Sequence, residues 1–137
     1  MEAIILCGVQ GSGKTTLYRD RFAATHEHVS LDVLGSRARE AKLLEACLEE
    51  GRSFVVDNTN PTVGDRARYV DAARAAGFKV IGYLVEGDGE SLHVGPGKAA
   101  ATRRRFVRPT PEEGFDELWH ASGRWRIEPL VTTPPLF

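Results

Sequence analysis

The segment GVQGSGKT at residues 8–15 constrains the fold of this chain more than any other feature. It matches the G-x-x-x-x-G-K-[ST] pattern of a P-loop, and it lies between a predicted buried strand and a predicted helix. In such a loop the glycines allow successive backbone N–H groups to point at phosphate oxygens, and the helix N-terminus adds its positive end. The pattern in this position predicts a nucleoside triphosphate site.

Individual positions of this loop have separate expected roles. We expect Lys14 to reach the β- and γ-phosphates of ATP, and we expect Thr15 to offer its hydroxyl to Mg²⁺. The other predicted ATP-binding residues are Gly8, Gly11, Ser12, Gly13 and Thr16. The loop does not decide the fate of the γ-phosphate, because hydrolysing switches, motors and kinases all share it.

Short apolar runs alternate with helical patterns along the chain, which is typical of an α/β protein with a parallel sheet and helices on both faces. The predicted strands are 3–7, 28–31, 53–57 and 78–86. The predicted helices are 14–24, 36–51, 63–77 and 98–109. We also expect a short helix at 110–119 and a final edge strand at 125–130, which nearby prolines shorten. The length of 137 residues predicts a single domain spanning 1–137.

Composition limits the classes of partner. The chain has 18 Lys plus Arg against 19 Asp plus Glu, so any attraction for a polyanion must be local. No apolar run approaches membrane-spanning length and the N-terminus has no basic flank, so we expect a cytoplasmic protein without a membrane segment. Cys7 and Cys47 lie in apolar contexts, which predicts reduced thiols packed as small hydrophobic groups.

Two carboxylates are predicted at the carboxyl ends of strands, where sheets of this kind bind ligands. Asp57 ends the third predicted strand. If that strand lies beside the first, Asp57 takes the place of a Walker-B acid that holds Mg²⁺ with Thr15. Asp32 ends the second predicted strand, where a kinase needs a carboxylate to accept the proton of an attacking hydroxyl. The alternative for each acid is a helix cap, and Ser36 competes with Asp32 for that role.

The residues after Asp57 form a polar cluster that ends at Pro61. Asn58, Thr59 and Asn60 are candidates for orienting water, phosphate or an acceptor, and we assign Asn58 and Asn60 to acceptor binding. Helix capping is the alternative for Asn60.

Three segments together resemble the 5′-hydroxyl polynucleotide kinase module of animal polynucleotide kinase-phosphatases, phage kinases and bacterial RNA-repair enzymes. They are GVQGSGKTT, HVSLDVLGSRAR and VVDNTNPTVGDRARYVDAARAAG. The later segment RPTPEEGFDEL is similar to the PT-x-x-EGF stretch that closes this module, so the resemblance spans most of residues 3–118. It implies a P-loop kinase-like three-layer sandwich, for which we expect strand order 2-3-1-4-5.

The resemblance also implies an activity, namely transfer of the γ-phosphate of ATP to a 5′-hydroxyl end of DNA or RNA with Mg²⁺. It implies Asp32 as the general base and Lys14 and Thr15 on the nucleotide. It places Arg39 near the acceptor, although a solvated helix face explains Arg39 as well. Two alternatives remain open: a kinase acting on a sugar, nucleoside or antibiotic hydroxyl, and a protein that binds ATP without transferring its phosphate.

The interval before the closing segment is shorter than in kinases of this type, whose fourth strand precedes a substantial lid with phosphate-clamping arginines. The lid-equivalent region here is about 87–108, a glycine-rich loop at 87–97 followed by a basic run. We expect Arg103 or Arg104 to clamp the transferring phosphate, because a planar guanidinium binds phosphate bidentately. Neighbouring arginines fan around a helix, so at most one or two of them enter the site.

We expect the histidines and tryptophans of the chain to have packing roles and no catalytic role. The histidines lie at 26, 28, 93 and 120, without metal-ligand spacing. Trp119 and Trp125 are expected to anchor the tail, with stacking on a base as the alternative.

Overall fold

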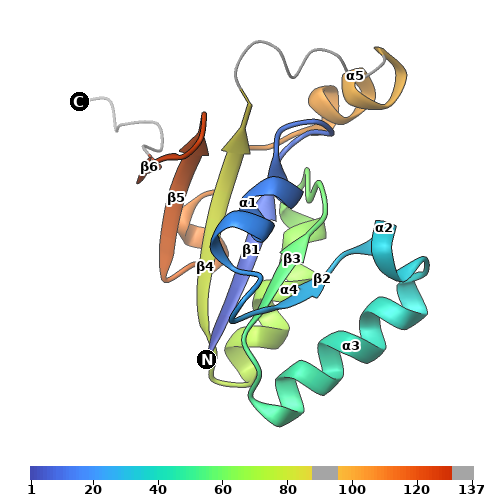
Figure 1. Ribbon diagram of the computed structural model, residues 1–137, viewed down its shortest axis with the longest axis vertical. Coiled ribbons are helices and arrows are strands. Elements are labelled where there is room, and N and C mark those ends of the chain that lie inside the picture. Colours follow the sequence, from blue (N-terminus) through green and yellow to red (C-terminus); the bar gives the residue numbers. More distant parts are fainter. Residues whose placement is uncertain (88–95, 131–137) are drawn as a thin grey trace.

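The fold is a six-stranded sheet between two layers of helices (Figure 1). The computed structural model describes residues 1–87 and 96–130, with the backbone alone for 96–100. Most of the predicted glycine-rich loop at 87–97, together with His93, lies outside the described residues.

The strands follow the spatial order β2-β3-β1-β4-β5-β6. Their bounds are β1 (Glu2–Cys7), β2 (Glu27–Val29), β3 (Phe54–Asp57), β4 (Lys79–Glu86), β5 (Glu117–Ser122) and β6 (Arg126–Pro129). The helices are α1 (Lys14–Arg21), α2 (Leu31–Leu34), α3 (Arg37–Glu50), α4 (Val63–Ala75) and α5 (Pro96–Arg105), with a 3₁₀ turn η2 (Pro111–Glu113). Each neighbouring pair of strands is parallel except β5 and β6, which form an antiparallel hairpin.

Alternation along the strands divides the core between the two faces of the sheet. Ile4 and Leu6 pack with Leu17 of α1 on one face. Ile5 packs on the other face, in the same cluster as Cys47 of α3 and residues of α4. Every one of these side chains is buried, and burying a large aliphatic side chain contributes roughly 1.5–3 kcal/mol. Helices therefore cover both faces, which confirms the predicted three-layer sandwich.

Polar residues and glycines define the ends of the long helices. The Ser36 hydroxyl accepts a hydrogen bond from the Arg39 N–H at 3.2 Å, and Thr62 caps α4 in the same way. Gly51 ends α3 with φ of 67°, as predicted from the sequence. Because Ser36 caps α3, the capping alternative for Asp32 is wrong.

The predicted second strand at 28–31 is wrong at its carboxyl end. The strand stops at Val29, and Ser30 becomes the N-cap of the short helix α2, accepting from the Val33 N–H at 3.4 Å. Gly35, with φ of 85°, ends this helix after one turn. Asp32 consequently lies in the first turn of α2, and not at the end of a strand.

The predicted helix at 110–119 is also wrong. Only η2 forms, and it ends at Gly114, whose φ of 107° does not continue a helix. Phe115 then enters the core, and the Asp116 N–H donates to the Val80 carbonyl at 2.7 Å, which starts β5 beside β4. The predicted order therefore holds for the first four strands, and β5 takes the fifth position. The predicted edge strand at 125–130 is confirmed as β6, which lies sixth and runs antiparallel.

A buried ion pair attaches this closing segment to α4. Arg66 is fully buried, and its guanidinium donates to both carboxylate oxygens of Glu113, at 2.7 and 3.0 Å. The third guanidinium contact, at 2.9 Å, is the carbonyl oxygen of Asn60. Arg66 therefore links α4, the loop after β3 and the turn before β5.

The two cysteines are buried and free, as the sequence predicts for packed thiols. Burial raises the pKa of Cys7 to about 12, so its thiol stays neutral. Among the described residues, none of the helices combines the length and apolar character needed to cross a bilayer.

Replacing Arg66 tests how much the fold depends on this ion pair. Arg66→Met leaves the Glu113 carboxylate buried without its partner, so we expect the free energy of unfolding in urea to fall by about 3–5 kcal/mol. Arg68→Met, an exposed arginine on the same helix, should change it by less than about 0.5 kcal/mol. Equal effects of the two substitutions would contradict a structural role for the pair.

Candidate active site

The P-loop connects β1 to α1 and depends on glycine for its shape. Gly11 and Gly13 have φ values of 82° and 102°, which side chains of L-residues rarely allow. A Cβ on Gly8 would lie 2.6 Å from the Val85 carbonyl oxygen and 2.7 Å from the Ser12 hydroxyl. Ser12 is buried, and its hydroxyl has no hydrogen-bond partner within the described part of the chain. Gly8 thus lets the backbone of the loop lie directly against the end of β4. The Ser12 hydroxyl is available to hydrogen-bond a ligand.

Lys14 is the buried cation of this loop. Its ammonium donates to the carbonyl oxygens of Gly8 at 3.0 Å and Val9 at 3.1 Å, and the residue is 8% exposed. Burial lowers the pKa of Lys14, although the nearby carboxylates of Asp57 and Asp32 act in the opposite direction. The Lys14 nitrogen is therefore held inside the loop by the backbone carbonyls of the loop itself.

Asp57 lies beside the P-loop because β3 pairs in parallel with β1, with Asp57 opposite Leu6. Its Oδ2 accepts hydrogen bonds from the Thr15 hydroxyl and from His28 Nε2, both at 2.8 Å. Burial raises the pKa of Asp57, but these two hydrogen bonds, together with the charges of His28 and Lys14, outweigh burial and lower the pKa below its ordinary value. The carboxylate therefore stays ionised next to the Thr15 hydroxyl.

His28 is a site residue that sequence reasoning missed, because the expectation for all four histidines was packing. Its ring also stacks on Tyr18, with the centroids 4.0 Å apart. The register explains its position: His28 pairs with Val55, and Val55 and Asp57 project from the same face of β3. Strand order and register were the only signals that could have found it.

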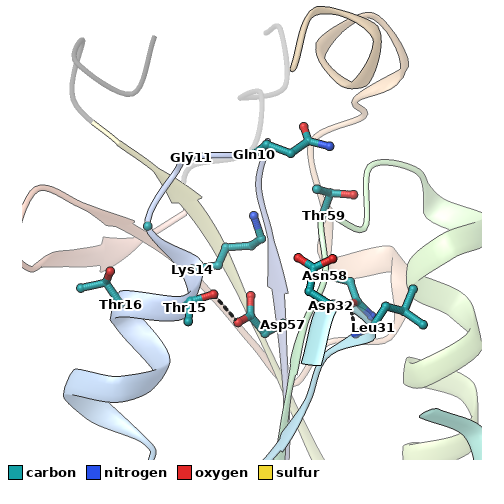
Figure 2. Close-up of a pocket in the computed structure, with 11 residues that line it drawn as sticks. Gln10, Gly11, Lys14, Thr15, Thr16, Leu31, Asp32, Asp57, Asn58 and Thr59 are labelled. Carbon is teal, nitrogen blue, oxygen red and sulfur yellow. Dashed lines mark hydrogen bonds between the residues drawn. The ribbon is translucent and has the colours of Figure 1, made fainter. Parts of the chain in front are cut away.

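The P-loop, α2 and the loop after β3 together line a cavity of about 570 Å³ (Figure 2). Its lining residues are Gln10, Gly11, Gly13, Lys14, Thr15, Thr16, Leu31, Asp32, Asp57, Asn58 and Thr59. Asp32 is exposed, and in the described segments no hydrogen bond occupies its carboxylate. Figure 2 shows Lys14, Asp57 and Asp32, from three different elements, gathered around the same space. The cavity therefore has a buried lysine on one side and a free carboxylate on its wall.

The two asparagines assigned to acceptor binding differ in position. Asn58 lines the cavity, but its carboxamide is already bonded to three groups on α2, α3 and α4. Asn60 is buried, does not line the cavity, and donates to the Leu6 carbonyl at 2.8 Å. Asn60 also adopts a positive φ of 46°. We therefore assign Asn60 to the shape of the loop.

The predicted arginines lie outside the cavity lining. Arg39 is exposed at the start of α3, and its guanidinium donates to the Leu34 carbonyl at 3.3 Å. The predicted basic helix is confirmed as α5, but it stops at Arg105 and not at residue 109. Arg103 and Arg104 are exposed near its end, and within the described residues no contact places either of them in the clamp role. Their neighbour Arg105 lies 3.7 Å from Asp65 of α4.

The tryptophans anchor the β5–β6 hairpin, as expected. Both pack against the core cluster that contains Leu17. The Trp125 indole N–H donates to Asp20 of α1 at 2.9 Å, and its ring lies 3.3 Å from where a Cβ on Gly13 would be.

The residues present fit a magnesium ion bound through few protein ligands. Thr15 and Asp57 supply adjacent oxygen atoms, which are the ligands that Mg²⁺ prefers. Within the described ranges no group of three or more acidic, histidine or cysteine side chains forms a metal site. Such a pair suits Mg²⁺ that takes its remaining ligands from water and phosphate oxygens.

Comparison with known families places the chain. A family model described as an AAA domain, AAA_33, matches residues 4–93, well over half of the sequence. The chain belongs to the AAA_33 family. A curated relative from Schizosaccharomyces pombe, named bifunctional polynucleotide phosphatase/kinase, is 34% identical over 135 residues. A second, from Acanthamoeba polyphaga mimivirus and named putative bifunctional polynucleotide phosphatase/kinase, is 25% identical. Each alignment covers 85% of this chain but only 32% of the relative, so this AAA_33 protein spans about a third of their length.

Solved structures share the fold of this AAA_33 protein. Kti12 from Chaetomium thermophilum, in complex with ADP-AlF3, matches with a TM-score of 0.69 and 17% identity over 89% of both chains. A gluconokinase from Sinorhizobium meliloti matches with a TM-score of 0.63 and 15% identity, over 91% of this chain and 84% of the other. These likenesses show the P-loop kinase fold, which agrees with the geometry of the phosphate loop.

Replacing Gly8 tests the close approach between the P-loop and β4. Gly8→Ala forces apart two backbone segments, so we expect a loss of about 1–3 kcal/mol in the free energy of unfolding. We also expect weaker binding of a fluorescent ATP analogue. Gly64→Ala is the matched control, because its Cβ would meet only Thr62, at 3.9 Å, on an exposed helix turn. That control should be neutral or stabilising, and equal losses in both variants would refute the steric argument.

Proposed function

We propose that this protein is a polynucleotide kinase that transfers the γ-phosphate of ATP to a 5′-hydroxyl end of DNA or RNA. One observation carries the proposal: the free carboxylate of Asp32 and the buried ammonium of Lys14 line the same cavity. Phosphoryl transfer to an alcohol needs a cationic grip on the phosphates and an acceptor for the proton of the alcohol. Lys14 and Asp32 have those two properties.

In the proposed reaction each of these groups has one role. The P-loop backbone and Lys14 would bind the β- and γ-phosphates and hold the γ-phosphorus in line with the incoming hydroxyl. Mg²⁺, held by Thr15 and Asp57, would neutralise charge on the phosphates. The new O–P bond forms as the bond from the γ-phosphorus to the bridging oxygen breaks, and ADP leaves. Asp32 takes the proton of the hydroxyl and passes it to solvent.

A hydrolysing switch fits the cavity less well than a kinase. Such enzymes commonly orient the attacking water with a glutamine, whereas the carboxylate here can accept a proton. Gln10 also lines the cavity, but its side-chain oxygen is buried, and Asp32 is exposed on the wall where an acceptor would enter.

The choice of a polynucleotide as the acceptor is supported by the names of the two curated relatives and by local charge. Arg37 and Arg39 are exposed at the start of α3, directly after the helix that carries Asp32. Arg103 and Arg104 remain proposed partners of phosphate groups. Figure 1 shows α5 at the end of the sheet where β1 leads into the P-loop. Exposed arginines on α3 and α5 suit an acceptor that continues as a chain of phosphates.

The proton-accepting role of Asp32 is tested with radiolabelled ATP and a 5′-hydroxyl oligonucleotide. Asp32→Asn keeps the size of the side chain but removes the base, so we expect phosphoryl transfer to fall by at least about a hundredfold. Binding of ATP should be preserved, since Lys14 and the P-loop are intact. Asp71→Asn, an exposed acid on α4, should leave transfer unchanged.

The same assay separates the competing functions. If the radiolabel appears on a sugar or nucleoside but not on DNA or RNA, the acceptor is a small molecule and not a polynucleotide. Tight ATP binding with no transfer to any alcohol would make the protein a nucleotide binder. Full activity of Asp32→Asn would remove the general base from the mechanism.

Salt dependence tests whether the acceptor is held through its phosphates. Each phosphate contact on a single strand releases counterions, so two contacts should raise the KM for the oligonucleotide about five- to tenfold between 50 and 200 mM salt. A short uncharged alcohol serves as the reference, because its KM should not follow salt in this way. If the KM for the oligonucleotide does not change with salt concentration, the arginines do not bind its phosphates.

A further inference from the structure

Beneath the cavity lies a buried polar cluster that joins α3, α4 and the loop after β3. Glu40 of α3 and Tyr69 of α4 are 2% and 1% exposed, and the Tyr69 hydroxyl donates to Glu40 Oε1 at 2.8 Å. Arg37 covers the cluster from the surface and donates to both of them at 3.0 Å. Neither Glu40 nor Tyr69 lines the nucleotide cavity. Burying a carboxylate and a phenol here costs solvation, which hydrophobic packing of α3 on α4 alone would avoid.

The cluster fixes the orientation of the Asn58 carboxamide. Asn58 Nδ2 donates to Glu40 Oε2 at 2.8 Å and to the Tyr69 hydroxyl at 3.2 Å. On the other side, Asn58 Oδ1 accepts from the Leu31 N–H at 3.0 Å. A carboxylate can only accept and a backbone N–H can only donate, so the carboxamide fits between them in one orientation alone.

Leu31 is the first residue of α2, and its N–H has no partner within that helix. Asn58 therefore provides the hydrogen bond that ties this turn to the loop after β3. The turn is four residues long and contains no buried residue, so packing does little to hold it. Asp32 follows directly after the residue that is tied.

We propose that Glu40 and Tyr69 are positioning residues that fix the Asn58 carboxamide, and that this carboxamide holds the first turn of α2 so that Asp32 faces Lys14. This inference rests on the proposed function of Asp32. It replaces acceptor binding as the role of Asn58, because its oxygen and its nitrogen already have partners. Three hydrogen-bonded side chains thus form a chain that ends on the Leu31 N–H, next to Asp32.

Two conservative substitutions outside the cavity test the proposal. Tyr69→Phe removes the hydroxyl that links Glu40 to Asn58, and Glu40→Gln introduces a donor where an acceptor is needed. Each should reduce kcat for phosphoryl transfer by about ten- to a hundredfold while the KM for ATP stays unchanged, because the P-loop is not altered. In an Asp32→Asn background, Tyr69→Phe should cause no further loss, since the group that it positions is gone.

Hydrogen exchange provides a readout that does not depend on transfer. The Leu31 amide, measured by NMR, should exchange at least about ten times faster in Tyr69→Phe and in Glu40→Gln than in the unaltered protein. Matched controls are Tyr83→Phe, which removes a hydroxyl on the other face of the sheet, and Glu45→Gln, an exposed acid of α3. Both controls should leave kcat and the Leu31 exchange rate unchanged.

The outcomes separate this inference from the function on which it rests. A lower melting temperature with unchanged kcat and unchanged Leu31 exchange would reduce the cluster to a structural role and overturn the proposal. Faster Leu31 exchange with unchanged kcat would also overturn it, because the turn would then not control the base. If the unaltered protein labels no acceptor, the proposed function fails, and the exchange rates alone then decide whether the cluster holds α2.

Discussion

The parallel pairing of β1 with β3 is the constraint on which the site depends. It puts Asp57 opposite Leu6, one residue before the end of β1, and brings the loop after β3 against the P-loop. The Gly8 N–H donates to the Thr59 carbonyl at 3.0 Å, so the backbones of the two loops are themselves joined. Two segments that are more than forty residues apart in the sequence thereby share one cavity, and the hydrogen bond between Thr15 and Asp57 follows from this pairing.

Buried charged side chains then fix the loop after β3. One of them comes from α4 and the other from α3. Arg66 bonds to the Asn60 carbonyl and to Glu113, while Glu40 bonds to the Asn58 carboxamide. Breaking a buried ion pair costs far more free energy than losing an exposed ion pair. Such buried contacts therefore favour a single arrangement of the loop. The polar run after Asp57 is therefore divided by position: Asn58 and Thr59 line the cavity, and Asn60 supports it from inside the fold.

The ionisable groups of the cavity differ in burial, and burial changes their pKa values to different extents. Burial lowers the pKa of Lys14, whereas hydrogen bonds from His28 and Thr15, with the nearby charges of His28 and Lys14, overcome burial at Asp57 and lower its pKa. Asp32 is exposed and lines the same cavity. The cavity thus brings a buried lysine, a buried acid and an exposed acid together, which is the set of groups on which the proposed phosphoryl transfer depends.

The sequence by itself determined the P-loop and the alternation of strands and helices, because glycine spacing and hydrophobic periodicity act locally. The order of the first four strands was expected from the resemblance to the polynucleotide kinase module, not from any local pattern. The sequence also identified Asp32, Asp57 and Lys14 by residue type. Only the tertiary structure decided where Asp32 lies, since Ser30 starts a helix that the apolar pattern of residues 28–31 hides. Strand register brought His28 to Asp57, and helix packing brought Glu40 and Tyr69 to Asn58. These contacts depend on side chains far apart in the chain, and no local pattern encodes which of them will meet.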